Sequence, residues 1–82
     1  MDRIEPDAGM ANPADTLRQA DSLRDQRLWS AAILAYRAYL DTRPEDWRAH
    51  VQLGHCLKES GDPAEALLAY RGAEALAQIR QA

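Results

Sequence analysis

The chain repeats itself at a spacing of 34 residues. The segment from Ala32 to Arg37, AILAYR, recurs as ALLAYR from Ala66 to Arg71, and Leu23 recurs as Leu57 in the same register without a gap. A fixed period of this size is typical of solenoids, in which each unit is one pair of helices that stacks on the next pair. The repeat therefore predicts two similar helical hairpins, in a class of protein that commonly binds other proteins.

Length and composition narrow the possible classes of protein. The 82 residues suffice for one domain, and 46% hydrophobic with 28% charged residues is the balance of a soluble globular chain. A net charge of -3 argues against a nucleic-acid binder, which normally carries a basic excess. The only cysteine, Cys56, cannot form an intrachain disulfide, which fits a reducing compartment. No apolar run approaches the roughly 20 residues that cross a bilayer, and residues 1–7 lack the pattern of a signal peptide. We expect a cytoplasmic protein without membrane insertion.

Cap residues, prolines and apolar spacing predict an all-α chain of four helices. Residues 1–11 are expected to form a flexible leader, and residues 12–82 the domain. The first helix should begin at Asn12 and Pro13, because asparagine caps helices and proline suits the first helical position, and it should end near residue 26. The others are expected over about residues 30–42, 46–60 and 63–80, with Gly61 in the left-handed conformation between the last two. An ordinary four-helix bundle is the alternative, but the register between the halves favours a repeat pair.

The repeating residues resemble the tetratricopeptide repeat (TPR) family. The match is close from Trp47 to Gln78 and looser from Pro13 to Asp46. The residues that carry it in the second unit are Leu53, Gly54, Leu57, Gly61, Asp62, Ala66, Tyr70 and Ala73, and in the first unit Ala20, Leu23, Ala32, Tyr36 and Pro44. The resemblance implies two helix-turn-helix hairpins, about residues 13–46 and 47–80, that form a short right-handed α-solenoid.

The first unit departs from the family's pattern in the turn between its helices. Arg27 stands where Gly61 stands in the second unit, and Leu28 replaces the capping Asp62. A left-handed arginine costs roughly 1 kcal/mol, so we expect the first turn to be the less regular of the two.

Candidate groups for catalysis or metal binding are few. His50 and His55 point about 140° apart on a helix, so they cannot share a metal ion. No serine lies in a nucleophile context, and no glycine-rich loop is present to hold a phosphate. We therefore expect no catalytic residue, no metal and no cofactor.

A binding role is better supported. In the TPR family the first helix of each pair lines a concave groove, and the resemblance assigns nine residues of this chain to it. They are Leu17, Arg18, Asp21, Arg24, Arg48, Val51, Gln52, His55 and Lys58. Their mixed, mildly basic character, flanked by Asp25 and Glu59, suggests an adaptor or scaffold that binds an acidic or amphipathic peptide. An ordinary solvated face is the alternative.

The fourth helix offers apolar residues beyond those that a hairpin needs. They are Leu68, Gly72, Ala75, Leu76 and Ile79, and Gly72 could also mark a close helix contact. Two repeats are fewer than such arrays normally contain, so something should cover this surface. A second copy, another protein or a continuation of the chain could do so, and a twofold homodimer is the simplest. Alternatively, these residues fold inward in a stable monomer.

The second functional hypothesis is an oligomerisation or docking module. The stretch from Val51 to Glu59 weakly resembles repeats attached to some bacterial glycosyltransferases, and nine arginines to one lysine suggest a GC-rich bacterial genome. On this hypothesis the module would serve a larger bacterial enzyme, and its apolar end would be the functional surface.

Overall fold

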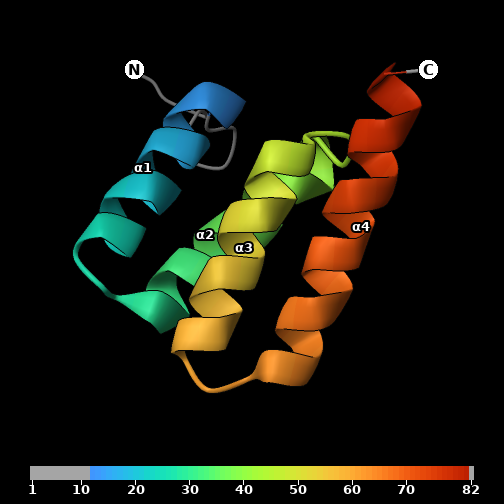
Figure 1. The fold of residues 1–82 in the computed structure, drawn as a ribbon. Helices are drawn as coiled ribbons and strands as arrows, with labels where there is room; N and C mark the ends of the chain where they lie inside the picture. The colour runs from blue at the N-terminus through green and yellow to red at the C-terminus, as the bar shows by residue number, and fades with distance from the viewer. Residues whose placement is uncertain (1–11, 82) are drawn as a thin grey trace, which may run out of the picture.

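The computed structural model describes residues 12–81, and this part of the chain is all-helical. Its helices are α1 (Pro13–Asp25), α2 (Trp29–Thr42), α3 (Trp47–Glu59) and α4 (Pro63–Gln81), and this range contains no strand (Figure 1). The predicted all-α class is confirmed, with each expected boundary within one residue of the observed one. The predicted flexible leader, residues 1–11, lies outside the described residues.

Consecutive helices pack on one another. α1 packs against α2, α2 against α3, and α3 against α4. Figure 1 shows two hairpins, α1 with α2 and α3 with α4, and α2 passes behind α3 in this view. The fourth helix has 19 residues against 14 in α2, because no proline corresponding to Pro44 ends it.

Side-chain caps start three of the four helices, and the sequence predicts two of them, Asn12 and Asp62. The Asn12 carboxamide oxygen accepts from the N–H of Ala14 (2.8 Å), and the Asp46 carboxylate accepts from that of Ala49 (3.3 Å). Asp62 accepts in the same way at the start of α4. α2 begins after Leu28 without a side-chain cap, as expected for this residue.

The turns within the two hairpins have the same backbone hydrogen bonds. In the first, the N–H of Arg27 donates to the carbonyl of Arg24 and that of Leu28 to Leu23, both at 2.9 Å. The second turn repeats both bonds 34 residues later, around Gly61. This is the Schellman arrangement, in which the residue after the helix is left-handed. The expectation of a less regular first turn was therefore wrong for the backbone. The two hydrogen bonds of the first turn hold Arg27 in the left-handed conformation, at a φ of 63°, despite the cost for an arginine. The corresponding φ of Gly61 is 95°.

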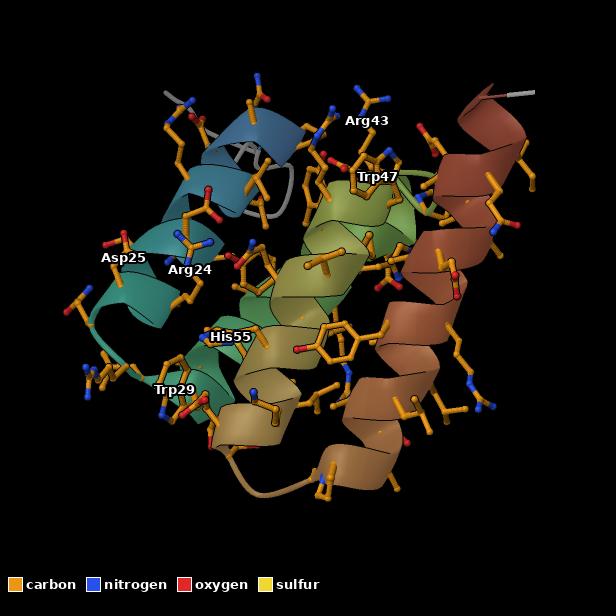
Figure 2. The ribbon with its side chains drawn as sticks, viewed as in Figure 1. Arg24, Asp25, Trp29, Arg43, Trp47 and His55 are labelled. Atoms are coloured by element: carbon orange, nitrogen blue, oxygen red, sulfur yellow. The ribbon has the colours of Figure 1, made fainter. Side chains whose placement is uncertain are left out.

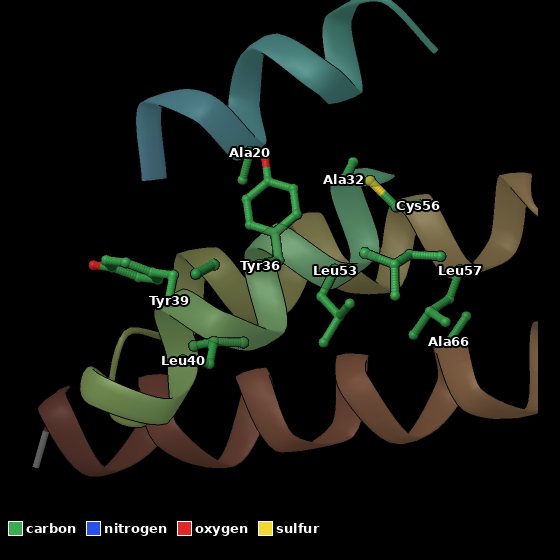
Figure 3. Close-up of a cluster of buried hydrophobic side chains, with 11 residues drawn as sticks. Ala20, Ala32, Tyr36, Tyr39, Leu40, Leu53, Cys56, Leu57 and Ala66 are labelled. Atoms are coloured by element: carbon green, nitrogen blue, oxygen red, sulfur yellow. The ribbon is translucent and has the colours of Figure 1, made fainter. Parts of the chain in front are cut away.

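The core runs through all four helices. Tyr36 and Cys56 have no exposed surface and belong to this cluster (Figure 3). Leu17, Leu23 and Tyr70 are partly buried and pack against it. A Cβ atom on Gly54 would lie only 2.8 Å from the ring of Tyr70, so glycine permits the close approach of α3 to α4. The other members of the core are Ala20, Ala32, Ile33, Tyr39, Leu40, Ala49, Leu53, Leu57 and Ala66.

The outer side of α4 is open to solvent. Leu68 is 62% exposed and Ile79 is 70% exposed, so these two residues do not fold inward as the monomer alternative supposed. Ala75 is also exposed, and Leu76 is partly buried. A Cβ atom on Gly72 would meet nothing within 4 Å. The close contact considered for Gly72 is therefore not made with the described part of this chain.

Candidate binding site

Arg24 is the centre of a polar network that joins three helices. Its guanidinium, on α1, donates to the Gln52 side-chain oxygen of α3 (2.9 Å) and to the Tyr36 hydroxyl of α2 (3.1 Å). It also pairs with Asp21 (3.3 Å) and Asp25 (2.9 Å) of its own helix. The Tyr36 hydroxyl in turn donates to Asp21 (2.5 Å). The bond to Gln52 links α1 to α3, whereas the two hairpins pack on each other through α2 and α3.

The surroundings raise the pKa of both Arg24 and Tyr36. Burial acts to lower the pKa of Arg24, but the hydrogen bond to Asp25 and the neighbouring negative charges raise it overall. Burial and the hydrogen bond to Asp21 raise the pKa of Tyr36 well above its usual range. The arginine therefore stays charged and the tyrosine stays neutral at any physiological pH. Arg24 acts mainly as a structural cation, because its donors are already engaged within the chain.

A first hollow of about 300 Å³ lies between α1 and α3. Leu17 contributes apolar surface to it, whereas Ala49 also lines it but is only 2% exposed. Among residues 12–81, Arg48 forms no ion pair, and its guanidinium carbon lies 4.7 Å from the centroid of the Trp47 ring. Arg48 is therefore the cation of this hollow that can meet a ligand. The remaining lining residues are Asp21, Arg24, Asp46 and Gln52.

A second hollow of about 320 Å³ lies between the end of α1, the start of α2 and α3. Arg24 lines both hollows, so they adjoin at its side chain, and we call the two hollows together the groove and each hollow a section of it. The rings of Trp29 and His55 meet edge to face in the second section, with centroids 5.6 Å apart (Figure 2). Its other lining residues are Asp25, Arg27 and Glu59. Acidic and basic residues balance in both sections, so the groove is not the mildly basic surface that the sequence suggested.

The structure brings six of the nine predicted groove residues to these hollows. They are Leu17, Asp21, Arg24, Arg48, Gln52 and His55. The other three line neither hollow: Arg18 pairs with Asp15 on the exposed side of α1, Val51 is partly buried, and Lys58 is exposed near the end of α3.

Sequence reasoning missed four residues that line the groove. Asp46 and Ala49 lie at the start of α3, and Arg27 belongs to the left-handed turn. Trp29 belongs to α2, and the resemblance assigned the groove only to the first helix of each pair. Trp29 is partly buried and packs against the core as well as lining the second section.

The described residues contain no group of three or more histidine, cysteine or acidic side chains that could hold a metal ion. His50 forms a hydrogen bond with the Pro44 carbonyl oxygen (2.9 Å), and His55 lies against Trp29. Within residues 12–81, no helix combines the length and apolar character needed to cross a bilayer.

Comparison with models of known protein families, with curated proteins and with solved structures finds no match to this chain.

Proposed function

We propose that this chain is a non-catalytic interaction module of the TPR type, a short right-handed α-solenoid that binds a peptide or protein partner between α1 and α3. The observation that carries the proposal is the pair of adjoining hollows, each of which is lined by residues from both hairpins. The repetition of the turn hydrogen bonds at a spacing of 34 residues supports two equivalent units. As an adaptor or scaffold, the chain would act in the cytoplasm, where its single thiol stays reduced.

The lining of the groove favours an amphipathic ligand over a strongly acidic one. A carboxylate of the ligand would pair with Arg48, and an apolar side chain would lie against Leu17. The edge of Trp29 offers a further apolar contact in the second section. A run of acidic residues would meet Asp25 and the other carboxylates of the groove, so repulsion should exclude it.

Selection from a random-peptide library, followed by titration calorimetry of the selected peptides, tests the proposal. Arg48→Glu should weaken binding by about tenfold or more, because it places a like charge opposite the ligand carboxylate. Arg71→Glu is the matched control, since Arg71 is exposed on α4 and away from the groove. Failure to select any peptide, or equal loss of affinity in both variants, would contradict groove binding.

The second candidate function is oligomerisation, or docking of a larger bacterial enzyme such as a glycosyltransferase. The exposure of Leu68 and Ile79 favours an association surface on α4, in the simplest case that of a homodimer. The two functions are separable, because variants in the groove should leave the α4 surface intact and variants in α4 should leave the groove intact.

A further inference from the structure

The outer face of α4 carries an unbroken stripe without charge. Leu68, Gly72, Ala75 and Ile79 follow one another at steps of four, three and four residues, so they lie on one side of the helix. Ala66 and Ala73 are buried on the opposite side, towards the core. The spacing of the stripe is that of a helix that packs along a partner helix.

The stripe is not a general property of these hairpins. The corresponding residues of α2 are Leu34, Ala38 and Asp41, so a charge interrupts the outer face of the first hairpin. Beside the stripe on α4, Glu65 in the first turn forms an ion pair with Arg37 of α2 (3.7 Å). Of the second helices of the two described hairpins, α4 therefore offers the uncharged outer face and α2 does not.

The surfaces of α1 and α4 at which another hairpin would pack do not favour one. Ala49, Leu53 and Cys56 are buried on α3, but the corresponding residues of α1 are polar and exposed. They are Asp15, Gln19 and Ser22. On α4, an exposed glutamate, Glu74, replaces the buried Leu40 of α2. Head-to-tail stacking of copies would bury these polar groups without partners, at a cost.

We infer that the stripe is covered by the same stripe of a second copy, with the two α4 helices antiparallel about a twofold axis. The inference rests on the proposal that α4 is an association surface. It adds that a second copy covers this surface, and it adds how the two α4 helices align. The stripe is self-complementary in this arrangement, because Leu68 lies opposite Ile79 of the second copy and Gly72 lies opposite Ala75.

Two further features fit antiparallel pairing. The small residues at the centre let the helices approach closely, which gives a role to a glycine that is unfavourable in a helix and fills no gap in its own chain. In this arrangement Arg71, on the flank of the stripe, lies beside Gln78 of the second copy. It does not lie beside Arg71 of the second copy, so the two positive charges do not meet.

Disulfide cross-linking tests the register. In a Cys56→Ala background, equal amounts of the Leu68→Cys and Ile79→Cys chains are mixed and oxidised. The mixture should form the cross-linked heterodimer, because this pairing brings the two residues within the roughly 4.4–6.8 Å between Cα atoms that a disulfide spans. Each chain alone should not cross-link, since the two copies of residue 68 lie about 16 Å apart along the axis. Efficient cross-linking of Leu68→Cys alone would overturn the antiparallel register.

Light scattering tests the association itself. The natural chain should be a dimer, and Leu68→Asp or Ile79→Asp should convert it to a helical monomer. Leu34→Asp is the control, because Leu34 is equally exposed (68%) and occupies the matching position on α2. A natural chain that stays monomeric at its highest soluble concentration would overturn the inference together with the association surface. If the chain is a dimer but Leu68→Cys alone cross-links, as in a pair of parallel helices, only the inference is overturned.

Discussion

The hydroxyl of Tyr36 allows the polar network to be tested with one atom. Tyr36→Phe keeps the ring in the core but removes the hydrogen bond to Asp21 (2.5 Å) and the one from Arg24 (3.1 Å). Hydrogen bonds to charged groups contribute about 1.5–3 kcal/mol. The side chains of Asp21 and Arg24 are 41% and 24% exposed, so water replaces part of what is lost. We therefore expect the free energy of unfolding to fall by about 1.5–2 kcal/mol, near the lower end of that range.

Tyr70→Phe is the matched control, because Tyr70 occupies the same position in the second hairpin. Within the described part of the chain, its hydroxyl forms no hydrogen bond, so the change should stay within about 0.5 kcal/mol. Urea unfolding followed by circular dichroism measures both variants. With a slope near 1 kcal/mol per molar urea for a chain of this size, Tyr36→Phe should lower the midpoint by about 1.5–2 M. Equal midpoints in the two variants would refute a stabilising role for the network.

Further predictions concern two glycines and one tyrosine. Gly54→Ala should destabilise by up to about 2 kcal/mol, because crowding against Tyr70 outweighs the gain in helix propensity, whereas Gly72→Ala should stabilise the dilute chain by about 1 kcal/mol. Thermal melts measure both, and a change of the same sign in the two variants would contradict the packing described. The hydrogen bond to Asp46, together with burial, raises the pKa of Tyr39 from 10.0 to about 12. The folded state therefore keeps the Tyr39 hydroxyl proton up to a higher pH than the unfolded state does. The resulting stabilisation of the folded state is complete below about pH 10 and is lost between about pH 10 and 12. Urea midpoints measured across that range should fall less steeply in Tyr39→Phe, and identical slopes would exclude this coupling.

The sequence predicted the helices well because their signals are local. The cap at Asn12, the proline at position 13 and the glycine at position 61 each act within one turn of the chain. The regular turn at Arg27 was missed because its stability comes from backbone hydrogen bonds, which any residue can form once the hairpin closes. Side-chain type alone therefore underestimated the first hairpin.

The candidate site was less predictable than the fold because it depends on packing between the hairpins. The pairs Arg18 with Asp15 and Arg24 with Asp21 lie three residues apart on one helix and could have been anticipated. The bond from Arg24 to Gln52 crosses 28 residues of sequence and follows only from the placement of α3 beside α1. The charge of the groove was misjudged because Arg18 and Lys58 do not line it, whereas Asp46 does.

The adjacency of the two hairpins is the basis of the groove, and nuclear Overhauser effects measure it directly in solution. The ring of Tyr36 lies in one core cluster with Ala20 of α1 and Cys56 of α3 (Figure 3). Stacked hairpins predict cross-peaks from the Tyr36 ring protons to the methyl group of Ala20 and to the β protons of Cys56. Cross-peaks to Ala20 without any to Cys56 would mean that α3 does not pack on the first hairpin, and the proposed groove would not exist.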